Sequence, residues 1–186
     1  MSTTPRLVTA ETLCQAVEAT LRADLPGVVA AFGWTERLGA IEDWHQVPRL
    51  EAISTANLPA GAITSPGLVR PPTYSRSSGW SATWRVVAGV YVRGEDHHDT
   101  AARCRDWAGV IRTVFLANRS LGGVADGGLV WAGEEYDEQP QKSVARTLAA
   151  CAVAIDVSAT NVIDTAALDE HRPVESFNHT ITPLES

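Results

Sequence analysis

The residues with the most obvious chemical potential lie in one short segment, GEDHHD, from Gly94 to Asp99. His97 and His98 stand side by side between carboxylates, so the segment holds the nitrogen and oxygen ligands that zinc and other divalent metals accept. Adjacent histidines on a tight turn seldom face one ion, however, and no H-x-E or H-E-x-x-H motif accompanies them. The simpler interpretation is a polar connection between a strand and a helix, with acidic groups near the helix start. The alternative is a metal-dependent enzyme centred on His97 and His98.

The rest of the chain supplies no recognisable catalytic motif. His45, His171 and His179 stand alone, and the sequence contains neither a G-x-S-x-G elbow nor a G-x-x-x-x-G-K-[ST] loop. The glycine-rich run from Gly122 to Gly128 lacks the following helix and the lysine that would cradle a phosphate, so it predicts a helix-to-strand connection. We therefore expect a protein that is not an enzyme, with no catalytic residues, no metal ligands and no cofactor.

Composition and charge narrow the class of protein. Of the 186 residues, 45% are hydrophobic and 20% are charged, which is usual for a globular domain. A formal net charge of −7 argues against wrapping duplex DNA by phosphate neutralisation, although it allows a protein past which DNA slides. No apolar run reaches the ~18 residues of a membrane span, and the first residues lack the apolar core of a signal peptide. We expect synthesis in the cytoplasm and no contact with a membrane.

The cysteines and tryptophans fall mostly in apolar stretches. The cysteines are far apart and form no C-x-x-C pair, which predicts three reduced core residues: Cys14, Cys104 and Cys151. Trp107 lies on the apolar stripe of a predicted helix and is expected in the core. The other tryptophans fit either the core or a contact surface: Trp34, Trp44, Trp80, Trp84 and Trp131.

A long strand is the clearest element that the sequence predicts. The segment from Trp80 to Arg93 alternates with period two, with one apolar face and one mixed face, as in a sheet backed by a helix. At about 3.3 Å per residue this run would span about 45 Å, which is more than most strands of globular domains. One end is therefore expected to project past its own sheet, where it could pair with another subunit.

Helical patterns precede and follow this strand. The first helix is expected to start at the N-cap Thr9 and to end at Pro26-Gly27, and Val28 to Phe32 would then form a short strand or a turn. The second is expected from its N-cap Asp99 to Asn118, where apolar residues recur with period 3.6. Its stop signal is Ser120 to Gly123.

The remaining strands complete the predicted fold. Short strands are expected at 50–54 and 61–65, and a hairpin at 128–136 and 143–157 around a turn at 137–142. The order is helix, short strands, long strand, helix, strand, strand. This order predicts an α+β class, with a mixed, mainly antiparallel sheet flanked by two helices.

Two segments show neither the strand period of two residues nor the helical period of 3.6 residues. We expect one domain over residues 1–157, with a long loop at 66–79, and a C-terminal extension or arm over 158–186. Pro71-Pro72 argues against a central strand in the loop. The loop is either a surface loop or a contact arm, because long loops in compact domains are usually functional or disordered.

Element order and three segments carry a resemblance to a known family. The segments are WRVVAGVYVRG, DTAARCRDWAGVIRTVF and VWAGEEYDEQPQKSVARTLAACAVAIDV. Over roughly residues 9 to 157 the chain resembles the tail terminator and tail-completion proteins of long-tailed bacteriophages. It departs from them in the Trp/Pro-rich segment from Gly33 to Gly79 and in its long C-terminal arm.

The resemblance implies a structural virion protein of the phage tail or neck. Such a protein would form a homo-oligomeric, hexameric ring that ends the tail tube and joins it to head-completion or connector proteins. DNA would pass through the ring only in transit. We hypothesise that the loop from Leu68 to Gly79 reaches the tube and that the arm after Ser158 touches a neighbour or the head side. The interface candidates are Arg70, Tyr74, Arg76, Trp80, Arg93 and Phe177.

Other interpretations of the same residues remain open. Within the structural class, the chain could be a head-closure or adaptor protein of the same neck. Outside it, besides the metal-dependent enzyme, the alternative is an α+β ligand-binding module in which Trp84 and Trp131 line a pocket.

Overall fold

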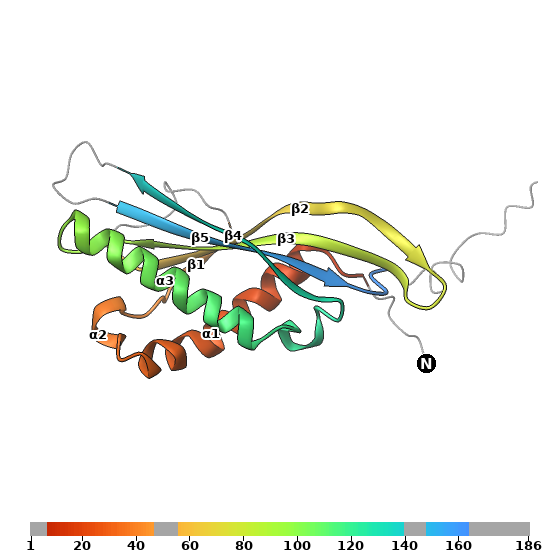
Figure 1. Ribbon diagram of the computed structural model, residues 1–186, viewed down its shortest axis with the longest axis horizontal. Coiled ribbons are helices and arrows are strands. Elements are labelled where there is room, and N and C mark those ends of the chain that lie inside the picture. Colours follow the sequence, from red (N-terminus) through yellow and green to blue (C-terminus); the bar gives the residue numbers. More distant parts are fainter. Residues whose placement is uncertain (1–6, 47–55, 140–147, 164–186) are drawn as a thin grey trace, which may run out of the picture.

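A computed structural model describes residues 7–46, 56–139 and 148–163 (Figure 1). Two long helices and four long strands account for most of these residues. The bounds of the elements are α1 (Ala10–Ala31), α2 (Thr35–Leu38), β1 (Trp44–His45), β2 (Ala60–Ser75), β3 (Gly79–Val92), α3 (His97–Ala117), a 3-10 turn (Leu121–Gly123), β4 (Gly128–Gln139) and β5 (Leu148–Ala159).

The strands form one mixed sheet in the order β1-β2-β3-β5-β4. Only β1 and β2 run parallel; the other neighbours are antiparallel. The helices α1 and α3 pack on each other and on one face of the sheet (Figure 1). The predicted α+β class, with its element order and its mainly antiparallel sheet flanked by two helices, is confirmed. The predicted strand at 50–54 lies outside the described residues.

The core lies between the two helices and the sheet. The apolar face of β3 is buried at every second residue, from Ala82 to Val92, as its period-two pattern predicts. The paired face of β5 is buried in the same way, which confirms that Leu148 to Ala152 is strand rather than helix. All three cysteines are free and buried, and Trp107 is buried, as expected. Among the described residues, no helix combines the length and hydropathy that crossing a membrane requires.

The prediction of a loop at 66–79 is wrong, because most of this segment is the second half of β2. β2 pairs with β3 from Ala60↔Tyr91 to Ser75↔Gly79. All three prolines of β2 stand at positions skipped by the ladder, where the register shifts. A bulge removes the need for a backbone donor, so proline is tolerated there. Gly67, with φ of +118°, supplies the left-handed residue of the first bulge.

The predicted helix ends also need correction. Pro26 does not end α1, which continues to Ala31. Proline removes only one intrahelical hydrogen bond, and burial of Val29 against the core holds the next turn in place. The N-cap of α3 is Asp96 rather than Asp99, because the Asp96 side chain accepts a hydrogen bond from the Asp99 amide at 2.7 Å.

The domain boundary at residue 157 is too early. β5 continues to Ala159, and Val162 is buried in the core. The Val162 amide donates to the Trp80 carbonyl at 2.9 Å, and the Val8 amide donates to the Val162 carbonyl at 2.9 Å. Residues 158–163 are therefore part of the domain. The remainder of the predicted arm, 164–186, lies outside the described residues.

Candidate self-assembly surfaces

The distal half of the β2–β3 hairpin projects beyond the ends of β4 and β5 (Figure 1). The residues of β3 before Ala82 pair with β2 but not with β5. The predicted projection of the long strand is therefore confirmed, and β2 accompanies it. Among the described residues no helix covers this half. The Asn161 and Val162 amides donate to the Ser78 and Trp80 carbonyls, and Trp80 is partly buried against the core.

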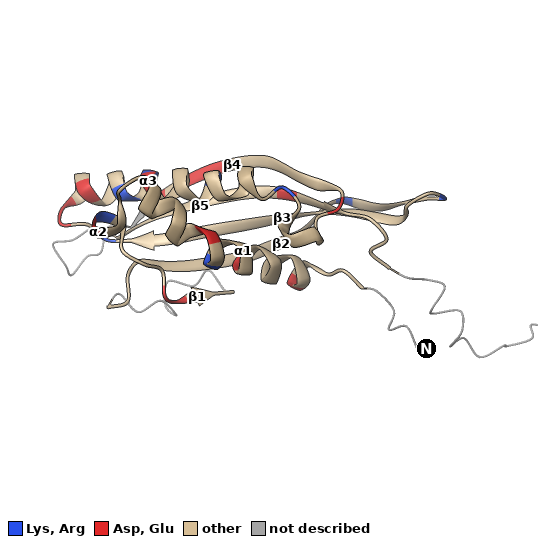
Figure 2. Ribbon diagram, turned by 90° about the horizontal axis from the view of Figure 1, so that it is seen from below, with Lys and Arg blue, Asp and Glu red and all other residues tan. Residues whose placement is uncertain are grey.

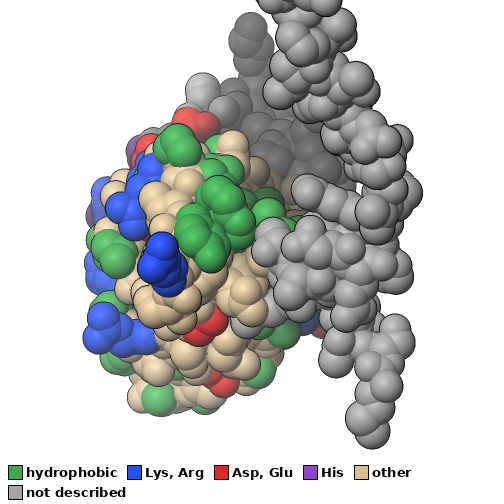
Figure 3. Space-filling view, turned by 90° about the vertical axis from the view of Figure 1, so that its right-hand side faces the viewer, with side chains coloured by type: hydrophobic (Ala, Val, Ile, Leu, Met, Phe, Trp, Pro, Cys, Tyr) green, Lys and Arg blue, Asp and Glu red, His purple; other side chains and the backbone are tan. Residues whose placement is uncertain are grey.

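The outer strand of the hairpin carries large apolar side chains and two cations, beginning at Leu68 opposite Trp84 and continuing onto the projecting tip. Leu68 is 47% exposed, Val69 44% and Tyr74 61%. Arg70 and Arg76 are also exposed. We call these five residues the hairpin surface. Figure 3 looks onto this end of the molecule and shows hydrophobic and basic side chains close together. Apolar groups of this size gathered with arginine are typical of a protein contact surface.

Local interactions hold the hairpin in a defined shape. Tyr74 lies directly opposite Trp80, and the two rings are tilted by 57° with their centroids 5.5 Å apart. At the tip, the Ser78 amide donates to the Ser75 hydroxyl at 3.1 Å. The aromatic pair and the serine turn reduce the freedom that the hairpin would lose on binding, which favours recognition.

The charge of the hairpin is one-sided. Residues 66–84 contain two arginines and no aspartate or glutamate. The next cation along β3, Arg85, differs because it is already neutralised: its Nε and Nη2 donate to the two carboxylate oxygens of Asp156 at 2.9 and 3.1 Å. Hydrogen bonding to Asp156 raises the pKa of Arg85. Figure 2 shows basic residues along the projecting hairpin without acidic ones at its tip.

A second surface of opposite charge lies on β4, the strand at the other edge of the sheet. We call Val130, Glu134, Glu135, Tyr136 and Asp137 the β4 surface. Val130 is 63% exposed and Tyr136 is 49% exposed. Residues 120–139 contain five acidic side chains and no basic one. The surface therefore combines apolar area with negative charge, as the hairpin surface combines apolar area with positive charge.

Part of the β4 surface is fixed by hydrogen bonds. Glu134 accepts from Arg112 of α3 at 2.6 Å, and its other oxygen accepts from the Tyr136 hydroxyl at 2.6 Å. Desolvation, together with the bond to Glu134, raises the pKa of Tyr136 to about 12. Register places Glu135 and Asp137 opposite Ala152 and Ala150, on the sheet face away from the helices. These two carboxylates are the exposed charges of the surface.

The two surfaces belong to opposite edges of one sheet, which suits contact between copies of the chain. A closed ring requires two different patches on each subunit, so that one patch meets the other patch of the neighbour. Complementary charge would fix their register and orientation. Continuous strand pairing along the outer edge of β2 is disfavoured because Pro66, Pro71 and Pro72 lack amide hydrogens. Contact would then be made mainly by side chains.

The structure brings four of the six predicted interface residues together. Arg70, Tyr74, Arg76 and Trp80 lie on the distal hairpin, where Trp80 supports Tyr74 from below. Arg93 follows the opposite end of β3, so it does not belong to this surface. Phe177 lies outside the described residues.

Sequence reasoning missed the apolar part of both surfaces. Leu68 and Val69 were not recognised because the segment was interpreted as a loop without period. Val130 and Tyr136 fall in the predicted strand at 128–136, whose residue pattern does not show that these two side chains are exposed. The sequence did contain a usable signal. Residues 66–84 carry only positive side chains, and residues 120–139 carry only negative ones.

The segment from Gly94 to Asp99 forms the start of α3. The Asp99 carboxylate accepts from the Glu95 amide at 2.9 Å and from Arg103 Nε at 2.8 Å. These contacts lower the pKa of Asp99, with the backbone hydrogen bond from Glu95 as the main cause. His97 and His98 are exposed. Within the described ranges, no three His, Cys, Asp or Glu side chains are grouped as a metal site would need.

Comparison with known proteins adds no assignment. No protein-family profile matches this chain, and no curated protein is similar enough in sequence to count as a relative.

Proposed function

We propose that this chain is a structural virion protein that assembles into a ring, ends the tail tube of a long-tailed phage and joins the tube to head-completion proteins. The observation that carries the proposal is the β2–β3 hairpin, which exposes apolar and cationic side chains together on one strand. The resemblance of the chain to tail terminator proteins supports the same function.

The placement of the two surfaces supports ring formation. The hairpin surface of one subunit would meet the β4 surface of the next. Arg70 and Arg76 would then approach Glu135 and Asp137, while exposed apolar side chains of the hairpin surface would bury area against Val130, which lies on the same sheet face as these carboxylates. Each apolar side chain buried in this way contributes about 25 cal/mol per Å² of area removed from water.

The net charge fits a ring through which DNA moves. With a formal net charge of −7, the subunit as a whole repels phosphate rather than gripping it.

Charge reversal tests the interface directly. We expect rings of the wild-type protein in electron micrographs, and a single oligomer by native mass spectrometry, either alone or at one end of isolated tail tubes. Arg70→Glu is expected to weaken assembly by at least about tenfold, because a like charge would face the β4 surface. Glu135→Arg is expected to weaken it similarly, and the variant that carries both changes is expected to recover assembly.

Arg119→Glu is the matched control, because Arg119 is an exposed arginine in the turn after α3 and belongs to neither surface. It changes the net charge by the same amount and is expected to leave assembly unchanged. A wild-type protein that stays monomeric and binds neither end of a tail tube would contradict the proposed function. Attachment to the head connector but not to tubes would indicate the head-closure alternative instead.

A further inference from the structure

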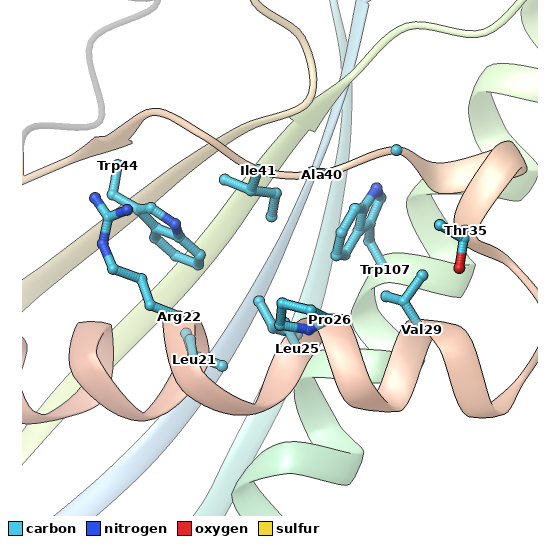
Figure 4. A pocket seen from close by; sticks show the side chains of 11 residues that line it. Leu21, Arg22, Leu25, Pro26, Val29, Thr35, Ala40, Ile41, Trp44 and Trp107 are labelled. Carbon is cyan, nitrogen blue, oxygen red and sulfur yellow. The ribbon is translucent and has the colours of Figure 1, made fainter.

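Two of the pockets that border α3 differ in the chemistry of their walls. The first measures about 380 Å³, lies between α1, the segment from α2 to β1, and α3 (Figure 4), and has mostly aliphatic walls. Trp84 and Trp131 do not line it. The second measures about 120 Å³ and is lined by Ala101, Cys104, Arg105, Tyr136, Asp137 and Ala149. Of these two pockets, only the second has a cysteine among its lining residues.

A second cysteine lies beside Cys104. A hydrogen bond joins the side chains of Cys104 and Cys151. The strand register supports the same placement, because Cys151 lies directly opposite Tyr136 and on the same face of β5 as Ala149. Both of those neighbours line the pocket that Cys104 lines. Two thiols that are far apart in the sequence therefore meet where α3 packs on the sheet.

The side chains around the two thiols are short, which allows α3 to lie close to β5. Ala101, Cys104 and Ala108 recur at helical spacing on one side of α3. The pocket brings Ala101 and Cys104 together with Ala149 of β5, and α3 packs more on β5 than on any other strand. A disulfide requires Cα atoms within about 7 Å of each other, and short side chains on both elements favour such an approach.

The surroundings of the thiols favour a neutral product. Cys104 is 2% exposed and Cys151 is 1% exposed. The hydrogen bond with Cys104, together with burial, raises the pKa of Cys151 well above its usual value. A bound metal ion would require thiolates, and the described ranges contain no group of three His, Cys, Asp or Glu side chains that could hold one. A disulfide carries no charge, so it fits an apolar interior.

The second pocket gives a small oxidant a route to Cys104. Its volume is several times the ~30 Å³ that a water molecule occupies in the liquid, so hydrogen peroxide fits inside it. Arg105 and Asp137 also line the pocket, so its wall is polar enough to admit such a molecule.

We propose that Cys104 and Cys151 form an oxidation site, at which a peroxide closes a disulfide between α3 and β5. The bond lies within one subunit, so the proposal does not rest on the proposed function. It would tie α3 to the strand that pairs with β4.

The reaction takes two steps. First, the Cys104 sulfur attacks one peroxide oxygen as a thiolate, the O–O bond breaks, and Cys104 becomes a sulfenic acid; the other oxygen leaves as hydroxide and takes up the proton that the thiol released, which gives water. Next, the Cys151 sulfur attacks the Cys104 sulfur, the S–O bond breaks, and the hydroxyl group leaves with the Cys151 proton as a second water. The two sulfur atoms together lose two electrons, which reduce the peroxide.

Peptide mapping of the folded protein tests the proposal. The reduced full-length chain is treated with hydrogen peroxide in native buffer, and the remaining thiols are then blocked with iodoacetamide in denaturant. We expect the intact mass to fall by two hydrogen atoms and a peptide pair to be linked through Cys104 and Cys151. Cys14, which is also buried, is expected to stay reduced and to be alkylated. The oxidised protein is expected to unfold at a higher urea concentration, because the bond constrains the unfolded chain.

Two variants separate the roles of the thiols. Cys151→Ala removes the second thiol, so Cys104 is expected to remain as the sulfenic acid, which dimedone traps. Cys14→Ala is the matched control, because it removes a buried cysteine of α1 that does not line this pocket. It is expected to form the disulfide as completely as the wild type.

Three results would overturn the proposal. The first is that Cys104 and Cys151 both remain open to alkylation after the peroxide has fully oxidised added glutathione. The second is a mixture in which links to Cys14 are as frequent as the link between Cys104 and Cys151, since the thiols would then meet only in unfolded chains. The third is an oxidised protein that does not resist urea better than the reduced one.

Discussion

The two halves of the β2–β3 hairpin share a backbone ladder and differ in what covers them. In the half that pairs with β5, β3 buries every second side chain against α1 and α3. Toward its tip, β2 exposes Leu68 and Val69, opposite the last residues of β3 that pair with β5, and then Tyr74 on the projecting part. The covered half therefore contributes to the stability of the monomer. The distal half contributes little to it and leaves apolar area available for a partner.

The largest expected effect separates folding from assembly. Phe115 of α3 is fully buried, so Phe115→Ala is expected to lower the free energy of unfolding by about 3–5 kcal/mol. Tyr74→Ala is expected to change it by less than about 0.5 kcal/mol, because the ring is mostly in solvent, and to impair assembly instead. Urea unfolding and native mass spectrometry measure the two effects. A Tyr74 variant that unfolds as easily as the Phe115 variant would contradict the comparison.

A smaller effect is expected where β1 joins the covered half. A Cβ atom at Gly61 would collide with the ring of Trp44, so glycine allows the tryptophan to lie against β2. Gly61→Ala is expected to cost about 1–3 kcal/mol of unfolding free energy, since the ring or the strand must move.

Gly27→Ala is the control for this change, because nothing lies within 4 Å of the added atom and the residue is inside α1. It is expected to stabilise the protein by about 0.4–1 kcal/mol. In thermal or urea unfolding, the change in unfolding free energy relative to the wild type should have opposite signs for the two variants. Equal signs would show that Trp44 does not rest against β2 as described.

The smallest expected effect lies at the end of the sheet opposite the hairpin, and it depends on pH. Hydrogen bonds from Glu95 and Arg103 lower the pKa of Asp99 in the folded protein. Its contribution to stability is therefore complete above the unfolded value of about 3.9 and is lost as the pH falls through the lower folded value.

Asp99→Asn measures this contribution. The variant is expected to be less stable than the wild type at neutral pH, and the difference should shrink as the pH falls below about 4. Urea unfolding between pH 7 and pH 3 follows the difference. A gap that does not change with pH would show that the Asp99 charge contributes nothing.

Particular residues show why the sequence predicts some elements and misses others. The alternation from Trp80 to Arg93 and the helical stripe around Trp107 predicted their elements because one face of each is buried. Residues 66–75 gave no such pattern because neither face of distal β2 is covered, and the prolines suggested a loop. The hydrogen bonds that make it a strand come from β3, which follows it in the chain.

The assembly surfaces were predictable only in part. Arg70, Tyr74 and Arg76 were singled out from their types alone. Their relation to Glu135 and Asp137 was not, because the sheet order places β3 and β5 between these strands, and sheet order is not visible in local periodicity.

By itself, the sequence determined the α+β class, the long projecting strand and the buried stripes of both helices. These three features follow from periodicity, because the spacing of apolar residues along the chain reflects which side chains of an element are buried. Only the tertiary structure decided which strand supports the prolines of β2, how far the domain continues past residue 157, and that Pro26 and Trp107 line one cavity. Each of these depends on contacts between residues far apart in the chain, and such contacts leave no local pattern.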